Sequence, residues 1–328
     1  GEAVAGYINI NTFNPFDRDG LSFSAEAGIG EQELGDVEIN KYNGRISWSN
    51  DQFGFLVFGS HNLRGRITDN REYDLTEVPG VGIIPNELDF RSYRGEREDN
   101  AYGGRVEFRP NQDTRLFFST LYSEFIDREE RNQFVFDFAG GNAAAGGTGV
   151  PAADTGYEPL VFVDRLLESG EYTNSTFTNT LGWDFLAGEW DVETRLNYTE
   201  TENLTDLPIP FSTAGFVAAS YDVTNINDPQ VTLFDQFTQD PLADINDLAY
   251  SAEFLLYFLG ELNSETWKGK VDATRDMQLF GKDATVKLGA QIDLREAEGG
   301  SALGFDFATI ASSGINIADF ATDTPWSS

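Results

Sequence analysis

The 328-residue chain contains no cysteine, one histidine and one methionine. Without cysteine it forms neither disulfides nor thiolate metal sites, and a lone His61 argues against a transition-metal site or a serine–histidine–aspartate triad. Its longest apolar runs, such as residues 254–259, fall far short of the ~20 residues that a membrane helix needs. The sequence has no phosphate-binding loop and no dinucleotide fingerprint. We therefore expect a protein that is not an enzyme.

Basic residues are scarce as well, with 22 Lys and Arg against 55 Asp and Glu and a formal net charge of −33. Nucleic acids and anionic lipid surfaces both attract basic proteins, so this charge argues against nucleic acid as a partner. Oxygen ligands in acidic loops suit Ca²⁺, but the spacing of these residues matches no EF-hand loop. We expect a solvated acidic surface, with no metal and no cofactor.

Alternation of polar and apolar residues with a period of two dominates the chain. It is clearest around the turn at residues 187–188, where Trp183 and Phe185 precede the turn and Trp190 and Val192 follow it. Such alternation places one set of side chains on each face of a β-strand. About seven of nine predicted strands show it. The nine strands lie at about residues 21–29, 41–48, 53–58, 101–109, 114–125, 180–185, 190–199, 267–277 and 284–295.

The predicted connections alternate between long and short. Short turns are expected at residues 50–52, 110–113, 187–188 and 280–283, and long connections at residues 30–40, around 79–86, at 129–170, at 202–264 and from 297 onward. One-sided loop length is typical of outer-membrane barrels, and Trp48, Trp183 and Trp190 lie beside short turns, as an aromatic girdle would. The sequence predicts an all-β, antiparallel transmembrane β-barrel with about nine strands in this chain, long extracellular loops and short periplasmic turns. A soluble or secreted all-β fold is the alternative.

Several segments resemble the TonB-dependent receptors of the bacterial outer membrane. Residues 6–16 resemble the end of the plug domain of that family and its proline-containing link into the first barrel strand. The motif within this segment is Gly6, Tyr7, Ile8, Asn9 and Ile10. Residues 50–57 resemble the first periplasmic turn and third strand. Residues 93–97, 109–114 and 121–123 resemble a branch of the family often linked to carbohydrate uptake.

The resemblance implies a barrel of about 22 strands with a plugged lumen, in the outer membrane of a Gram-negative bacterium. Residues 1–17 would be the end of the plug and its link, and residues 18–328 the N-terminal part of the barrel. Its partners would be the TonB complex, outer-membrane lipid and a small-molecule or oligosaccharide ligand. Energised uptake of an oligosaccharide is favoured over uptake of an iron chelate such as a siderophore. A passive porin-type channel and a secreted all-β binding protein or adhesin are the alternatives.

Two sets of residues are candidates for a site. Charges on the polar strand faces would point into the lumen, where they hold a plug, line a solute path or simply form a hydrated wall. These charges are Arg45, Arg105, Glu107, Lys270, Asp272, Lys287, Asp293 and Arg295. Aromatic side chains in the long loops would stack on sugar rings or pack the loops onto one another. These aromatics are Tyr73, Phe90, Tyr93, Phe134, Phe136 and Tyr157.

Overall fold

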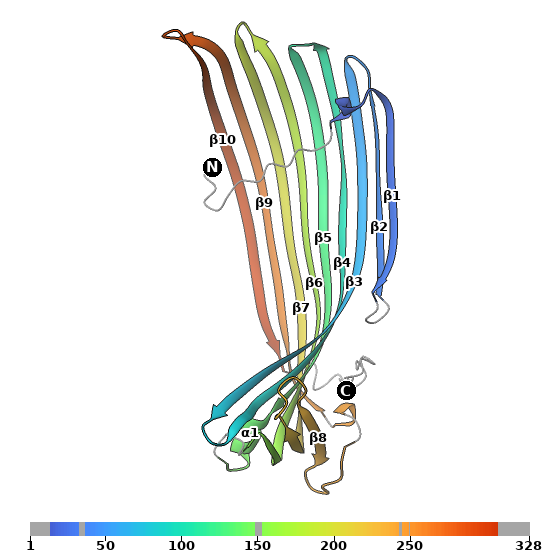
Figure 1. The fold of residues 1–328 in the computed structure, drawn as a ribbon, viewed down its shortest axis with the longest axis vertical. Helices are drawn as coiled ribbons and strands as arrows, with labels where there is room; N and C mark the ends of the chain where they lie inside the picture. The colour runs from blue at the N-terminus through green and yellow to red at the C-terminus, as the bar shows by residue number, and fades with distance from the viewer. Residues whose placement is uncertain (1–13, 33–36, 148–152, 243–244, 249, 308–328) are drawn as a thin grey trace.

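The computed structural model describes residues 14–32, 37–147, 153–242, 245–248 and 250–307, and these form one antiparallel sheet of ten strands (Figure 1). The strands are β1 (Gly20–Gln32), β2 (Val37–Ser49), β3 (Phe53–Val78), β4 (Gly82–Asn111), β5 (Thr114–Asp137), β6 (Thr155–Ala187), β7 (Trp190–Asp222), β8 (Gln230–Asp235), β9 (Tyr250–Leu279) and β10 (Lys282–Asp306). The helical segments are η1 (Pro15–Asp17), α1 (Phe138–Ala144) and η2 (Ile245–Asp247). None of the helices in these ranges has the length and hydropathy of a membrane span.

The sheet is a meander in which each strand pairs with the next along the chain, except that β9 follows β7 and the short β8 pairs with the end of β7. All of these pairs are antiparallel. The predicted all-β antiparallel sheet is therefore confirmed. Within the described residues, no ladder joins β1 to β10, so hydrogen bonds do not close this sheet into a barrel.

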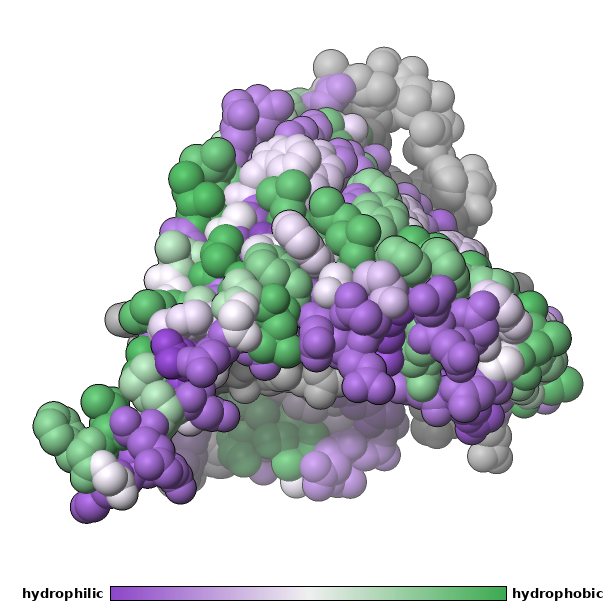
Figure 2. All heavy atoms as spheres, turned by 90° about the horizontal axis from the view of Figure 1, so that it is seen from above, coloured by the Kyte–Doolittle hydropathy of each residue, from purple (hydrophilic) through white to green (hydrophobic). Residues whose placement is uncertain are grey.

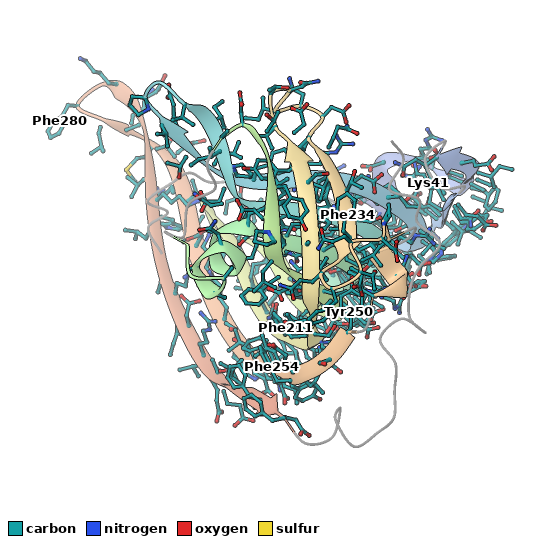
Figure 3. All side chains as sticks on the ribbon, turned by 90° about the horizontal axis from the view of Figure 1, so that it is seen from below. Lys41, Phe211, Phe234, Tyr250, Phe254 and Phe280 are labelled. Carbon is teal, nitrogen blue, oxygen red and sulfur yellow. The ribbon has the colours of Figure 1, made fainter. Side chains whose placement is uncertain are left out.

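The four predicted short turns are confirmed, and all lie at one end of the sheet, which we call the short-turn end (top of Figure 1). The β9–β10 turn consists of Phe280 and Gly281, which both have positive φ angles, of 53° and 77°. Two-residue turns with this geometry match the twist of the strands they join. Figure 3 shows Phe280 projecting away from the rest of the molecule, and its side chain is fully exposed.

The predicted long connections are wrong in extent, because most of their residues belong to strands. The described β1 and β2 leave only residues 33–36 between them, and β3 and β4 are joined by residues 79–81. Much of 129–170 and 202–264 continues β5, β6, β7 and β9 or forms β8, and β10 extends to residue 306. Alternation fails there because both faces are covered, as at residues 132–136, which are all buried. Pro85 sits beside a register shift, where a strand tolerates the missing N–H donor.

The main hydrophobic cluster lies at the opposite end of the sheet, which we call the far end (bottom of Figure 1). It joins Leu88 of β4, Phe136 and Phe138 of β5 and α1, Val161 of β6 and Val217 of β7. Here the β3–β4 hairpin crosses the other strands, and α1 and β8 lie beside them (Figure 1). At the far end, several elements therefore pack together around a buried cluster, whereas the sheet near the short-turn end is a single layer.

Candidate functional site

The eight charges predicted to share one face do so in the half of the sheet near the short turns. The register aligns Leu56, Arg105, Ser119, Thr180, Asn197, Lys268 and Asp293 in one cross-strand row. A parallel row holds Glu107, Phe117, Gly182, Arg195 and Lys270. We call this surface the polar face and the opposite surface of the same half the apolar face. That the polar face lines a lumen stays a prediction.

Glu107 is the centre of the most buried ion pairs on the polar face. Its side chain has no exposed area, and it pairs with Arg105 at 2.6 Å and with Arg109 at 2.6 Å. Both arginines lie two residues from Glu107 on β4, so they project from the same strand face. The segment around η1 covers this group, since the Asn14 amide donates to Glu107 at 3.5 Å and the Phe16 ring lies 3.8 Å from the Arg109 guanidinium.

The η1 segment fits against β3 because residue 54 is glycine. A Cβ atom at Gly54 would approach both Phe16 and Pro15 within 2.9 Å, so a larger residue would displace the segment. The Asn14 side chain caps η1, and Ser49 donates to the Arg18 carbonyl at 2.9 Å. A small cavity of about 190 Å³ remains beside η1, lined by Asn14, Asp17, Arg18, Ser22, Arg45, Ser47 and Leu56.

A second group surrounds Asp184 and was missed by sequence reasoning. Arg115 and Arg195 both pair with the Asp184 carboxylate. The guanidinium groups of Arg105, Arg115 and Arg195 lie 3.8, 5.3 and 5.0 Å from the centre of the Phe117 ring. Arg115 and Asp184 are 69 residues apart in the sequence, so only the register of β5 on β6 brings them together.

The remaining predicted charges form a looser group on β9 and β10. Lys270 and Lys287 approach the Asp272 carboxylate at 2.5 and 3.5 Å, and Lys268 approaches Asp293 at 3.6 Å. Arg295 donates to the Ser264 hydroxyl at 3.0 Å. The lysines are 42–61% exposed, and such exposed pairs add little to stability.

The apolar face is exposed across the full width of the sheet. Its large side chains run from β1 to β10 and include Leu21, Phe23, Ile46, Val57, Val106, Phe118, Leu181, Leu196, Val271, Leu288 and Ile292. Nothing in the described residues covers them. Seen from the short-turn end, hydrophobic and hydrophilic side chains gather in separate patches (Figure 2). A monomeric protein in water rarely exposes so large an apolar surface.

Two rows of aromatic side chains bound this apolar surface. The row near the short turns contains Trp48, Phe53, Phe108, Trp183, Phe185 and Trp190, and the second row contains Tyr42, Tyr102, Tyr122, Phe177, Tyr198 and Trp267. Neighbouring rings in the rows approach closely, as Phe53 and Phe108 do at 4.4 Å and Tyr198 and Trp267 at 4.8 Å. The sequence predicted the first row from its tryptophans. The second row becomes visible only when the register of the strands is known.

Carboxylates mark the border of the apolar surface beyond the second row. Glu200, Glu265 and Glu296 lie directly opposite one another on β7, β9 and β10. Between the turn and this border, the apolar band occupies residues 190–198 on β7 and 284–294 on β10. The band is therefore nine to eleven residues long, although β6 and β7 each contain 33 residues.

The six aromatic residues predicted to stack on sugar rings lie at the far end, and their predicted location in loops is wrong, because all six belong to strands. Phe134 is buried beside Arg165 and Tyr250. Phe136 belongs to the main hydrophobic cluster, and Tyr73 and Phe90 are half-buried against that cluster. The Tyr73–Phe90 and Phe90–Phe136 ring centres are 5.9 and 5.7 Å apart. Tyr93 and Tyr157 lie outside this cluster; the Tyr157 side chain is exposed and its hydroxyl donates to Gln239. The alternative in which these aromatics pack the protein together therefore describes Tyr73, Phe90, Phe134 and Phe136. Contact of any of the six with a ligand stays a prediction.

Arg165 of β6 is a far-end residue that the sequence did not single out. Its side chain is fully buried, and its three guanidinium nitrogens have no hydrogen-bond partner among the described residues. The Phe134 and Tyr250 rings lie 5.0 and 5.8 Å from the guanidinium. The motif Gly6, Tyr7, Ile8, Asn9 and Ile10 lies outside the described residues, so the predicted end of the plug stays a prediction.

Asp164 should make the far end less stable as pH rises. Burial raises its pKa above the usual range; a hydrogen bond from Thr213 opposes this rise, while the charges of Glu253 and Asp137 add to it. Because the folded state then binds the proton more tightly, stability falls as pH increases from about 4, the unfolded pKa of Asp, through the raised pKa. We expect hydrogen-exchange protection factors around β6 to be higher at pH 5 than at pH 7. Asp164→Asn should reduce this difference, and equal pH dependence in the variant would contradict the assignment.

The polar and apolar faces together define the candidate site, which is a sheet with a charged surface on one side and an apolar surface on the other. Comparisons with family models, with curated proteins and with solved structures find no match to the chain. The polar face offers fixed guanidinium groups and carboxylates, which bind and orient solutes.

Proposed function

We propose that this chain is part of an outer-membrane β-barrel receptor that takes up a nutrient, more specifically an oligosaccharide, with energy supplied through TonB. The single observation that supports membrane insertion is the exposed apolar band between two aromatic rows. A transmembrane β-strand needs about 9–11 residues, with aromatic girdles at both interfaces. The band on β7 and β10 has that length, and the polar face provides the hydrated inner surface that such barrels require.

The strands extend far beyond the apolar band. Between Phe177, in the second aromatic row, and Thr155, β6 continues for 22 residues, or about 70 Å at ~3.3 Å per residue. Long strand extensions on the side opposite the short turns correspond to the extracellular side of an outer-membrane barrel. In the proposal, ligand capture occurs at these extensions, and the solute then passes along the polar face.

Coupling to TonB and the choice of an oligosaccharide rest on the sequence resemblance. The docking of η1 on the polar face is compatible with a segment that enters from a domain inside the barrel. A passive channel has the same strand pattern, and a secreted binding protein would cover its apolar face with further protein. Solubility and energy dependence separate these three functions.

The proposal is tested with the complete gene product in its native host. We expect it in the outer-membrane fraction after carbonate and urea washing, because nothing in the part of the chain that the structure describes covers the apolar band. Release into the aqueous phase without detergent would contradict membrane insertion. We also expect uptake of a labelled oligosaccharide to stop in a deletion strain and after addition of a protonophore. Uptake that survives the protonophore would indicate a passive channel, and uptake of an iron chelate alone would contradict the carbohydrate assignment.

A further inference from the structure

We propose that Arg105, Arg109, Arg115 and Arg195 form an anion-binding site on the polar face, which takes the carboxylate or sulfate groups of an acidic oligosaccharide. This inference rests on the proposed function, in which the polar face lines the path of the solute. It adds the chemical class of the ligand. Below, we call these four residues the arginine cluster.

The arginine cluster has more cationic groups than its close partners neutralise. Glu107 pairs with Arg105 and Arg109, and Asp184 pairs with Arg115 and Arg195. Glu193, which is more than half exposed, reaches Arg195 only at 3.9 Å. Four guanidinium groups thus share two closely bound carboxylates, and the residual charge is positive. This is a local excess in a chain whose net charge is −33.

The two carboxylates lie beneath the arginines. The Glu107 side chain has no exposed area and that of Asp184 has 19%, whereas those of Arg109 and Arg115 each have 35%. Arg105 and Arg195 are 14% and 24% exposed, so each of these two carboxylates is less exposed than both of its arginines, and a solute that approaches the polar face meets the guanidinium groups before Glu107 and Asp184. The buried carboxylates fix the orientation of the arginines, because each pairs with two of them.

Several guanidinium donors remain available for a ligand. The hydrogen bonds of Arg105, Arg109 and Arg115 to their carboxylates use the Nε and Nη2 atoms. Their Nη1 atoms have no hydrogen-bond partner in the part of the chain that the structure describes, and none of these atoms is buried. Guanidinium groups bind carboxylate, sulfate and phosphate oxygens through paired N–H donors. The unused donors on neighbouring arginines suit such a group.

Phe117 provides a rigid support for three of these arginines. Its ring is 6% exposed and lies against Gly182, where an added Cβ would overlap the ring. Arg105, Arg115 and Arg195 surround the ring, an arrangement that holds guanidinium groups in place through cation–π contacts. Lys270 lies opposite Arg195 in the register and extends the basic surface toward β9.

The binding experiment uses the complete gene product in detergent micelles. Two probes are compared by isothermal titration calorimetry: trigalacturonic acid, which has three carboxylates, and the neutral maltotriose. We expect the acidic probe to bind at least about tenfold more tightly, and its affinity to fall with added salt, because charge attraction is screened. Salt should leave the affinity for maltotriose nearly unchanged.

Substitutions test whether the acidic probe binds at the arginine cluster. Arg115→Gln and Arg195→Gln should each lower the affinity for trigalacturonic acid by about tenfold, because each removes charge-assisted hydrogen bonds. Arg295→Gln is the matched control, since Arg295 is also on the polar face but outside the cluster, and it should leave this affinity unchanged. Arg115→Lys keeps the charge but loses the planar pair of donors, so we expect an intermediate loss. Each variant is used only if its unfolding temperature matches that of the unchanged protein, and the salt dependence needs no variant.

Two results would overturn the anion site. One is an affinity for trigalacturonic acid no higher than that for maltotriose, and the other is an equal loss of affinity in Arg115→Gln and Arg295→Gln. Either result leaves membrane insertion and energised uptake of neutral sugars intact. Failure of the proposed function gives a different result, which is release of the protein from washed membranes or uptake that needs no energy.

Discussion

Arginine in place of Leu196 is expected to destabilise the membrane-inserted complete gene product by about 2–4 kcal/mol, the cost of a cationic side chain near the bilayer midplane on a lipid-facing strand. Leu196 lies within the apolar band on β7, two residues from its centre at Thr194, with Leu181 on one side and Gly269 on the other. Its side chain is 47% exposed, and neither of its cross-strand neighbours, Leu181 and Gly269, carries a charge. Unfolding by urea in detergent or lipid vesicles measures the effect.

Asn197→Arg is the matched control for this experiment. Asn197 is the next residue on β7, but its side chain lies on the polar face and donates to the Thr180 hydroxyl at 2.9 Å. An arginine there meets water and other charges, so we expect a change below about 1 kcal/mol. Similar losses for both variants would show that the two faces do not differ in their surroundings, and a soluble all-β fold would then be the better description.

Glu107→Gln is expected to destabilise the protein by about 3–5 kcal/mol, because it removes one partner of a buried ion pair and leaves cationic groups uncompensated. The loss falls on two arginines at once, since Arg105 and Arg109 both depend on this carboxylate. It also weakens the contact between η1 and the polar face, where Asn14 donates to Glu107. Urea unfolding of the complete gene product gives the stability, and trypsin cleavage after Arg18 reports release of η1.

Asp293→Asn provides the comparison for Glu107→Gln. Asp293 pairs with Lys268 on the same face at 3.6 Å, but both side chains are close to half exposed. An exposed pair of this kind contributes about 0–1 kcal/mol. A loss at Asp293 as large as that at Glu107 would contradict the view that burial, and not pairing alone, makes Glu107 important.

Sequence patterns predict the half of the sheet near the short turns because only one of its faces is apolar. Residues such as Leu181 and Trp183 then alternate with polar neighbours, which identifies both the strand and its faces. At the far end this pattern fails. Residues 132–136 are covered on both sides, and Pro85 suggests a loop although it lies within β4. Tertiary packing there determines the strands, and periodicity alone does not reveal it.

The residues of the polar face could be predicted from the sequence, but only some of the ion pairs between them could. Glu107 and its two arginines are two residues apart on one strand, so alternation alone places them together. Arg115 and Asp184 belong to different strands, and a register shift of one residue would separate them. Burial of Arg165 could not be predicted either, because it depends on rings contributed by β5 and β9.

The unequal lengths of the two outer strands restrict what can stand next to the sheet. Neither β1, with 13 residues, nor β10, with 25, has a second neighbour in the described residues. Direct pairing of β1 with β10 would leave about half of the longer edge with free N–H and C=O groups, which readily recruit foreign strands. To pair along its full length, a strand next to β10 must therefore be nearly twice as long as a strand next to β1. In the proposed barrel, a rim completed from these two edges would be oblique, with one side of its opening higher than the other.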